Sequence, residues 1–268
     1  MNAQCFKQHL SWLGILVLAL VGFSCRSAKS VEQTGKTRRE ITVSAAASLQ
    51  DAFREIGKQL ETRTDTRVNF NFGASGALQK QIESGAPVDV FASAGRPQMD
   101  PLVLQGLIAP ESRRDFARNA LVLVVPADQT VELKGFADLG SQQVKRIAVG
   151  NPKTVPAGQY SEQSLTRLGL WQRLQSRLVF GEDVRQVLDY VSRGEVEAGL
   201  VYASDVRVGD NRVRVVACAP ADSHDPILYP IGVVLASKQS EAAHSFIDAV
   251  MSDEGQRILE KYGFERIR

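Results

Sequence analysis

Strand-like and helix-like segments alternate along most of this chain, and this alternation restricts the fold more than any other feature of the sequence. Residues 41–44 are a short apolar run typical of a strand, and residues 49–60 carry apolar side chains at helical spacing. The same order repeats downstream, which predicts strands at 68–72 and 88–92 and helices at 78–83 and 98–105. Such alternation is typical of an α/β fold with a largely parallel sheet.

A second series of strands and helices begins near residue 121 and predicts a second lobe. We expect strands at 121–125, 146–149 and 198–202, and helices at 161–168 and 184–192. A strand within 227–236 and one closing helix at 240–261 follow. Periodicity alone allows this last part either to extend the second lobe or to return to the first. The connections between the lobes must be short, which suits a hinge.

The first residues are typical of an export signal. Residues 10–23 form an apolar run after Lys7 and His9, and this run is too short to span a bilayer comfortably. We therefore assign residues 1–24 to a signal peptide. Residues 25–40 are rich in Ser, Lys, Thr and Arg and have no apolar period, which predicts a solvated tether before a fold that begins near Ile41.

Cys25 follows the apolar run directly, and the residues before it resemble a bacterial lipoprotein cleavage box. That pattern prefers a branched apolar residue where Gly22 stands. The expectation is either lipid attachment at Cys25 or a plain signal that is cleaved a few residues later. Cys5 lies in the signal, so a lipidated Cys25 leaves Cys218 without a partner, and no disulfide framework is expected.

The charge balance bears on the partners of the exported chain. The formal net charge is +2 in a chain that is 44% hydrophobic and 23% charged, which is ordinary globular composition. Residues 1–24 contain one Lys and no acid, so the exported part carries +1. No polybasic surface for nucleic acid is implied.

Three predicted strand-to-helix corners, at residues 45–48, 73–76 and 155–158, are built from small residues. The first N–H groups of a helix lack intrahelical partners and lie at the positive end of the helix dipole, roughly half an elementary charge, so they attract anions. Taken alone, Ser48 is typical of an N-cap with Asp51 completing a capping box, and Ser75 of a turn. Several converging corners would make an anion site.

Tyr202 ends a predicted strand, at the edge where open α/β sheets collect their ligands. The alternative is a tyrosine that caps the edge of the core.

Segments 41–49, 72–78 and 85–94 resemble the periplasmic molybdate-binding proteins in content, order and spacing. The resemblance continues through residues 149–152, 155–158, 182–184, 201–205 and 261–264, and so covers roughly residues 41–264. It implies an α/β, two-lobe type II periplasmic-binding-protein fold with mainly parallel sheets and a double hinge crossing. It also implies that lobe I comprises residues 41–117 and 226–268 and lobe II residues 118–225.

In that family an oxyanion sits between the lobes, and the resemblance carries its contacts to five positions here. Ser48 and Ser75 would each give a hydroxyl and a backbone N–H, Ala157 and Val184 a backbone N–H, and Tyr202 its phenolic O–H. The chain departs from the family at Gly76, where many members have a second serine, and at Gly95 and Asn151, where an acidic residue is frequent. None of these departures removes a carried-over contact.

A site built only from donors satisfies an oxyanion that carries no proton, whereas protonated phosphate needs an acceptor for its own O–H. This reasoning retains molybdate, tungstate and sulfate, and the resemblance selects molybdate or tungstate. The family implies no cofactor and no direct metal-ion ligand, because the metal arrives inside the oxyanion. It also implies a monomer in the periplasm or on the outer face of the cell membrane, with an ABC permease and its ATPase as partners. Contact with the membrane would come only through Cys25.

Two alternatives remain from the sequence. The first is a binding protein for another small oxyanion such as sulfate. The second is an enzyme on the same fold, with Ser48 or Ser75 as a nucleophile, which would need an adjacent base. His224 and His244 are the histidines beyond the signal, and neither lies in a nucleophile motif. No zinc-spaced Cys/His cluster, phosphate-binding glycine-lysine loop or dinucleotide glycine pattern occurs in the sequence.

Overall fold

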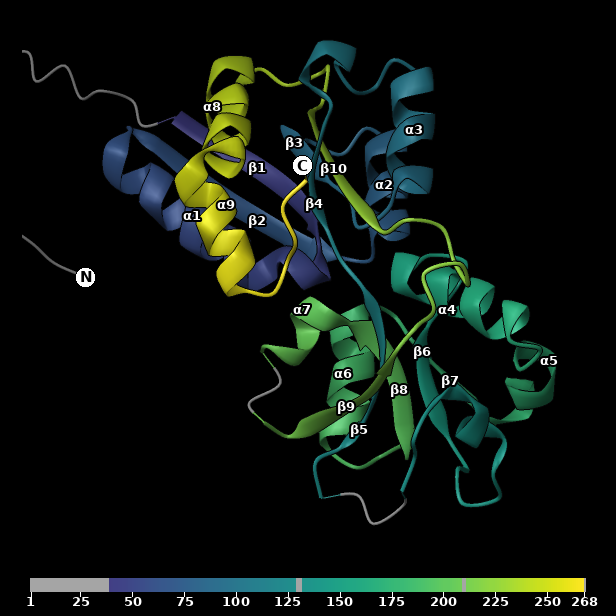
Figure 1. Ribbon diagram of the computed structural model, residues 1–268. Helices are drawn as coiled ribbons and strands as arrows, with labels where there is room; N and C mark the ends of the chain where they lie inside the picture. Colours follow the sequence, from purple (N-terminus) through teal and green to yellow (C-terminus); the bar gives the residue numbers. More distant parts are fainter. Residues whose placement is uncertain (1–38, 129–131, 209–210, 268) are drawn as a thin grey trace, which may run out of the picture. The chain divides into compact units, whose positions relative to one another are not determined.

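The computed structural model describes residues 39–128, 132–208 and 211–267, and they form two five-stranded sheets with helices packed against them (Figure 1). The predicted signal peptide, Cys25 and the predicted tether up to residue 38 lie outside the described residues. None of the helices within the described ranges is long and apolar enough to cross a membrane.

The first sheet has the strand order β2-β1-β3-β10-β4. Its strands are β1 (Arg39–Ala46), β2 (Thr66–Gly73), β3 (Val90–Ala92), β4 (Arg114–Arg118) and β10 (Leu228–Val233). Helices α1 (Gln50–Arg63), α8 (Ser240–Met251) and α9 (Asp253–Lys261) pack together on one face, and α2 (Ser75–Glu83) and α3 (Arg96–Leu104) lie on the other (Figure 1). Phe53 of α1 packs at the centre of this core, because its ring centroid lies 5.7 Å from that of Phe116 and 5.4 Å from that of Phe246.

The second sheet has the strand order β7-β6-β8-β5-β9. Its strands are β5 (Leu121–Pro126), β6 (Ile147–Gly150), β7 (Leu178–Gly181), β8 (Ala198–Tyr202) and β9 (Val213–Cys218). The helices of this part are α4 (Pro156–Arg167), α5 (Trp171–Leu174), α6 (Val184–Ser192) and α7 (Ala203–Val206). Every residue of β5 and β8 is buried, which explains why these strands are continuous apolar runs in the sequence.

The chain passes from one sheet to the other twice. The first passage joins β4 to β5 through Asn119 and Ala120, and the second joins β9 to β10. Strand β10 pairs antiparallel with β3 and β4, so the strand that periodicity left unplaced lies in the first sheet. Both sheets are mixed: β1 pairs in parallel with β2 and β3, and β6 with β7 and β8, whereas the pairings of β10 and β5 are antiparallel.

The prediction of a single closing helix at 240–261 is wrong, because the chain breaks at Ser252 into α8 and α9. Ser252 is in an extended conformation (φ −63°, ψ 158°) and its Oγ accepts a hydrogen bond of 3.1 Å from the N–H of Gly255. Asp253 and Glu254 follow in the first turn of α9. The serine cap and the acidic first turn are both typical of a helix start, although the helical spacing of apolar residues continues across Ser252.

Candidate functional site

The five residues that the resemblance selects lie around one small cavity. Ser48 and Ser75 come from helix starts that follow strands of the first sheet, and Ala157, Val184 and Tyr202 come from elements of the second sheet. The space open to the centre of a water molecule is about 10 Å³, and the five residues are at most 4% exposed. The remaining lining residues are Ala46, Ala47, Gly73, Ala74, Ala94, Val155, Pro156 and Asp183.

Helix starts supply most of the cavity wall. A short 3₁₀ turn, η1 (Ala47–Leu49), precedes α1, while α2 begins at Ser75, α4 at Pro156 and α6 at Val184. The N-cap residues of η1, α2 and α4 form no side-chain cap hydrogen bond. No side chain therefore neutralises the positive end of these helices, which favours an anion in the cavity, although the N–H of Gly76 in α2 already donates to the carbonyl oxygen of Thr154.

Asp183 is the acidic residue among the described residues that line the cavity, and its side chain stabilises the start of the helix that follows it. Its side chain caps α6 by accepting a hydrogen bond of 3.0 Å from the N–H of Gln186. This arrangement binds the first turn of α6 to the preceding loop.

The interpretation of Ser48 as an N-cap is wrong, because its hydroxyl faces a different partner. Ser48 Oγ lies 3.0 Å from the phenol oxygen of Tyr229, a fully buried residue of β10. The same phenol oxygen accepts a hydrogen bond of 3.2 Å from Nδ2 of Asn119, in the first passage between the sheets. Ser75 Oγ accepts a hydrogen bond of 3.0 Å from the N–H of Ala94, so this hydroxyl also has a donor behind it.

Both buried tyrosines near the cavity keep their phenolic hydrogen. Burial raises the pKa of Tyr202 and of Tyr229 well above the usual 10, and the nearby Asp205 carboxylate acts in the same direction. The Tyr202 hydroxyl lies 3.5 Å from the carbonyl oxygen of Ala94, which is long for an O–H···O bond. This hydroxyl also forms a hydrogen bond with the Tyr229 phenol, so it would exchange that bond for one to a ligand.

A group of charged residues connects the two sheets beside the cavity. The guanidinium of Arg185, the second residue of α6, lies 2.8 Å from the Asp51 carboxylate of α1 and 3.1 Å from the Asp205 carboxylate of α7. These are ion pairs by distance, without the alignment of hydrogen bonds. Burial raises the pKa of the Asp205 carboxyl to about 6, and Arg185 and the N–H of Tyr202 offset part of that rise.

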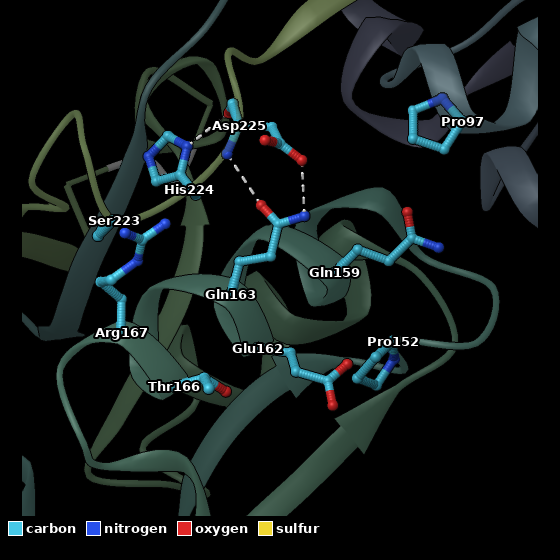
Figure 2. Close-up of a pocket in the computed structure, with 10 residues that line it drawn as sticks. All are labelled: Pro97, Pro152, Gln159, Glu162, Gln163, Thr166, Arg167, Ser223, His224 and Asp225. Atoms are coloured by element: carbon cyan, nitrogen blue, oxygen red, sulfur yellow. Dashed lines mark hydrogen bonds between the residues drawn. The ribbon is translucent and has the colours of Figure 1, made fainter.

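A larger and more open groove lies along the outer face of α4, and it contains none of the five predicted residues. Figure 2 shows Gln163 of α4 facing Asp225, while the side chain of Glu162 points toward Pro152. Gln163 and Asp225 hold the two sides together through hydrogen bonds of 3.0 and 2.9 Å. Within the described ranges no cluster of three or more His, Cys, Asp and Glu could hold a metal ion.

The comparisons with known proteins identify the family. The family model for bacterial extracellular solute-binding proteins matches residues 41–265. This chain belongs to that family. The solute-binding protein is 41% identical over 260 residues to a putative ABC transporter substrate-binding lipoprotein, YvgL, of Bacillus subtilis, covering 97% of this chain and 98% of the relative. It is 36% identical over 253 residues to the molybdate-binding protein ModA of Haemophilus influenzae, covering 93% and 95%.

A solved structure confirms the fold of this solute-binding protein. The periplasmic molybdate-binding protein of Azotobacter vinelandii superposes with a TM-score of 0.78 at 24% identity, over 85% of this chain and 100% of that one. The predicted two-lobe α/β fold of the periplasmic binding proteins is therefore confirmed, and family membership gives the protein the extracytoplasmic solute-binding role that the sequence predicted.

Sequence reasoning missed several residues that support the cavity. Tyr229 lies inside an apolar strand and is typical there of a core residue, and Asn119 stands between two strands as an ordinary loop amide. Arg185 and Asp205 come shortly after predicted site residues, but the sequence does not show that they form ion pairs. The signal that was available is weak: Asn119 is an isolated polar residue in a connection of two residues, where a side chain can reach both sheets.

Proposed function

We propose that this solute-binding protein captures molybdate or tungstate and delivers it to an ABC importer. The observation that carries the proposal is the cavity itself, whose wall is formed by hydroxyls and uncapped helix starts from both sheets. The names of its relatives support the choice of anion, since ModA of Haemophilus influenzae is a molybdate-binding protein.

The donors around the cavity favour an anion without a proton. Ser48, Ser75 and Tyr202 would offer hydroxyls, and Ser48, Ser75, Ala157 and Val184 would offer backbone N–H groups. Asp183 Oδ1 accepts a hydrogen bond from the N–H of Gln186 at the start of α6, so this oxygen already has a donor. Phosphate near neutral pH carries a hydrogen that needs an acceptor, whereas molybdate and tungstate carry none.

The proposal includes the parts of the protein that surround the cavity. Residues 41–117 and 226–268 form lobe I and residues 118–225 form lobe II, after a signal peptide at 1–24 and a tether at 25–40. The protein acts as a monomer in the periplasm or on the outer face of the membrane, with a permease and its ATPase as partners. Cys25 carries a lipid as the membrane anchor, which the lipoprotein among its relatives supports.

The protein acts by binding rather than by catalysis. Ser48 contacts Tyr229 and Ser75 contacts the N–H of Ala94, so neither hydroxyl has a base as its hydrogen-bond partner. His224 and His244 each bond to a backbone carbonyl close to them in the chain, Asp225 and Ser240. The cavity needs no cofactor for this role.

Calorimetric titration of the purified protein with four anions tests the proposal. We expect tight binding of molybdate and tungstate, weak binding of sulfate and negligible binding of phosphate. Native mass spectrometry with molybdate added should show one anion per monomer. Sulfate that binds as tightly as molybdate would overturn the assigned specificity, and no binding of either larger anion would overturn the function.

A further inference from the structure

We propose that Asn119 and Tyr229 set the direction of the Ser48 hydroxyl so that it donates into the cavity, and that this relay selects anions without a proton. The inference rests on the proposed function, and it adds two residues that do not line the cavity. The relay runs from the passage between the sheets, through β10, to the start of α1.

The orientation of the Asn119 amide is fixed by backbone donors. Its Oδ1 accepts hydrogen bonds from the N–H of Ala120 at 3.0 Å and of Ser204 at 3.4 Å. A backbone N–H can only donate, so the oxygen must face these two groups and the NH₂ must face the other way. There Nδ2 lies 2.8 Å from Ser204 Oγ and 3.2 Å from the phenol oxygen of Tyr229, and it donates to both.

The direction at Asn119 determines the direction at Tyr229. The phenol oxygen accepts from Asn119, and burial keeps its own hydrogen in place. Tyr202 also forms a hydrogen bond with this phenol, and that bond raises the pKa of Tyr202, as expected of a donor. Ser48 Oγ, at 3.0 Å, then accepts the Tyr229 hydrogen. The opposite direction, from Ser48 to Tyr229, would take this acceptor from the Tyr229 hydrogen while Asn119 and Tyr202 also donate to the same oxygen, which is costly.

The direction at Tyr229 determines the direction at Ser48. An oxygen that accepts from Tyr229 must send its own hydrogen elsewhere, and Ser48 lines the cavity. Ser75 is set in the same way, since the N–H of Ala94 donates to its Oγ. Two serine hydroxyls thus face a ligand as donors, and each oxygen has already used one of its two acceptor lone pairs.

Four proteins test the relay in calorimetric titrations with molybdate: wild type, Tyr229→Phe, Ser48→Ala and the double variant. Ser48→Ala should weaken binding roughly ten- to a hundred-fold, the loss expected for a hydrogen bond to a charged group. Tyr229→Phe should weaken binding several-fold in the wild type and clearly less in the Ser48→Ala background, because part of its effect acts through that hydroxyl and the rest through Tyr202. Tyr190→Phe, at a partly buried tyrosine of α6 that does not line the cavity, is the control and should bind as the wild type does.

A selectivity measurement separates direction from general damage. With inorganic phosphate as the second probe, Tyr229→Phe should lower the ratio of molybdate to phosphate affinity, because the freed Ser48 hydroxyl can then accept. Ser112→Ala, at a buried serine outside the cavity, should leave this ratio unchanged.

Asn119→Asp provides a second route if Tyr229→Phe does not fold. The new carboxylate keeps the oxygen that faces Ala120 and Ser204 but accepts from Tyr229, which reverses the relay. Asn119→Asp should weaken molybdate binding less in the Ser48→Ala background than in the wild type, because only the effect of the added charge remains there. Additive losses in both double variants, or an unchanged affinity in both single variants, overturn the relay. A wild type that binds neither molybdate nor tungstate overturns the proposed function and the relay with it.

Discussion

At the scale of single residues, neighbouring groups donate hydrogen bonds to the serine oxygens in the cavity wall, so that the serine hydrogens can face a ligand. Ser75 shows this most simply, because its donor is the backbone N–H of Ala94 and therefore cannot reverse. Its hydroxyl is fully buried, so water does not replace a lost contact to the ligand.

Ser75→Ala should weaken molybdate binding by about 1.5 to 3 kcal/mol, the range for a hydrogen bond to a charged group. The backbone N–H of residue 75 is retained, so binding should be weakened and not abolished. Calorimetric titration measures the loss. Ser112→Ala removes an equally buried hydroxyl, with partners at Ala109 and Val233, and should change stability but not affinity. Equal affinities of Ser75→Ala and wild type would remove Ser75 from the site.

Asp205 predicts a pH dependence of stability. Its pKa is about 6 in the folded protein and 3.8 as the usual value, so the folded state binds more protons between these two pH values. The free energy of unfolding therefore falls as the pH rises from about 4 to about 6, by up to about 3 kcal/mol, and this loss persists above that range. The charges that face this carboxyl are Arg185, Asp51 and Asp183.

Denaturant unfolding of wild type and Asp205→Asn across this range isolates the effect. The stability difference between the two proteins should change with pH between about 4 and about 6 and be constant above it. A difference that is the same at all pH values would show that Asp205 does not titrate in that window.

At the scale of elements, four helix starts surround the cavity, and α6 differs from α2 and α4 because a side chain caps it. Asp183 provides this cap and also places a negative charge in the lining. The two roles can be separated, because asparagine caps a helix about as well as aspartate does.

Asp183→Ala should lower the free energy of unfolding by about 1 kcal/mol, the usual cost of a lost N-cap. Asp183→Asn should keep the stability and raise the affinity for a dianion, since it removes a like charge from the cavity wall. Thermal unfolding and calorimetric titration of the two variants give the two quantities. An affinity that falls in Asp183→Asn would show that the carboxylate helps the ligand to bind.

The sequence predicted those elements that carry a strong period or a buried apolar run. The helix at 184–192 and the strand at 198–202 have the predicted bounds. Strands β4, β7 and β9 were not predicted: β4 and β9 carry charged residues and several exposed positions, and the apolar run of β7 is only three residues long. The five cavity positions came from the resemblance. The partners behind them, Tyr229 and Asn119, depend on pairings between distant segments that no local pattern records.

At the scale of the whole molecule, backbone and side-chain contacts hold the two lobes together around the cavity. The N–H of Gly76 donates to the carbonyl oxygen of Thr154 at 2.9 Å, and Gln98 of α3 donates to Gln159 of α4 at 2.9 Å. A Cβ at Gly76 would lie 2.6 Å from that carbonyl oxygen. The absence of a side chain at Gly76 therefore permits this close approach.

Gly76→Ala should weaken molybdate binding about ten-fold or more, because the added methyl group collides with the backbone of the other lobe and prevents full closure. Small-angle scattering with saturating molybdate should show a larger radius of gyration than for wild type. Gly135→Ala is the matched control, since its backbone is extended and its Cβ would meet no atom within 4 Å. Wild-type affinity in Gly76→Ala would show that closure tolerates the methyl group.

The burial of the cavity wall has a kinetic consequence. Walls that are almost inaccessible to solvent leave an occupant no exit while the Gly76–Thr154 and Gln98–Gln159 contacts persist. The residence time of the ligand then depends on how often these two contacts break. Two anions of different affinity would therefore leave through the same rate-limiting movement. A membrane partner that separates the two lobes would therefore release the ligand without contacting it.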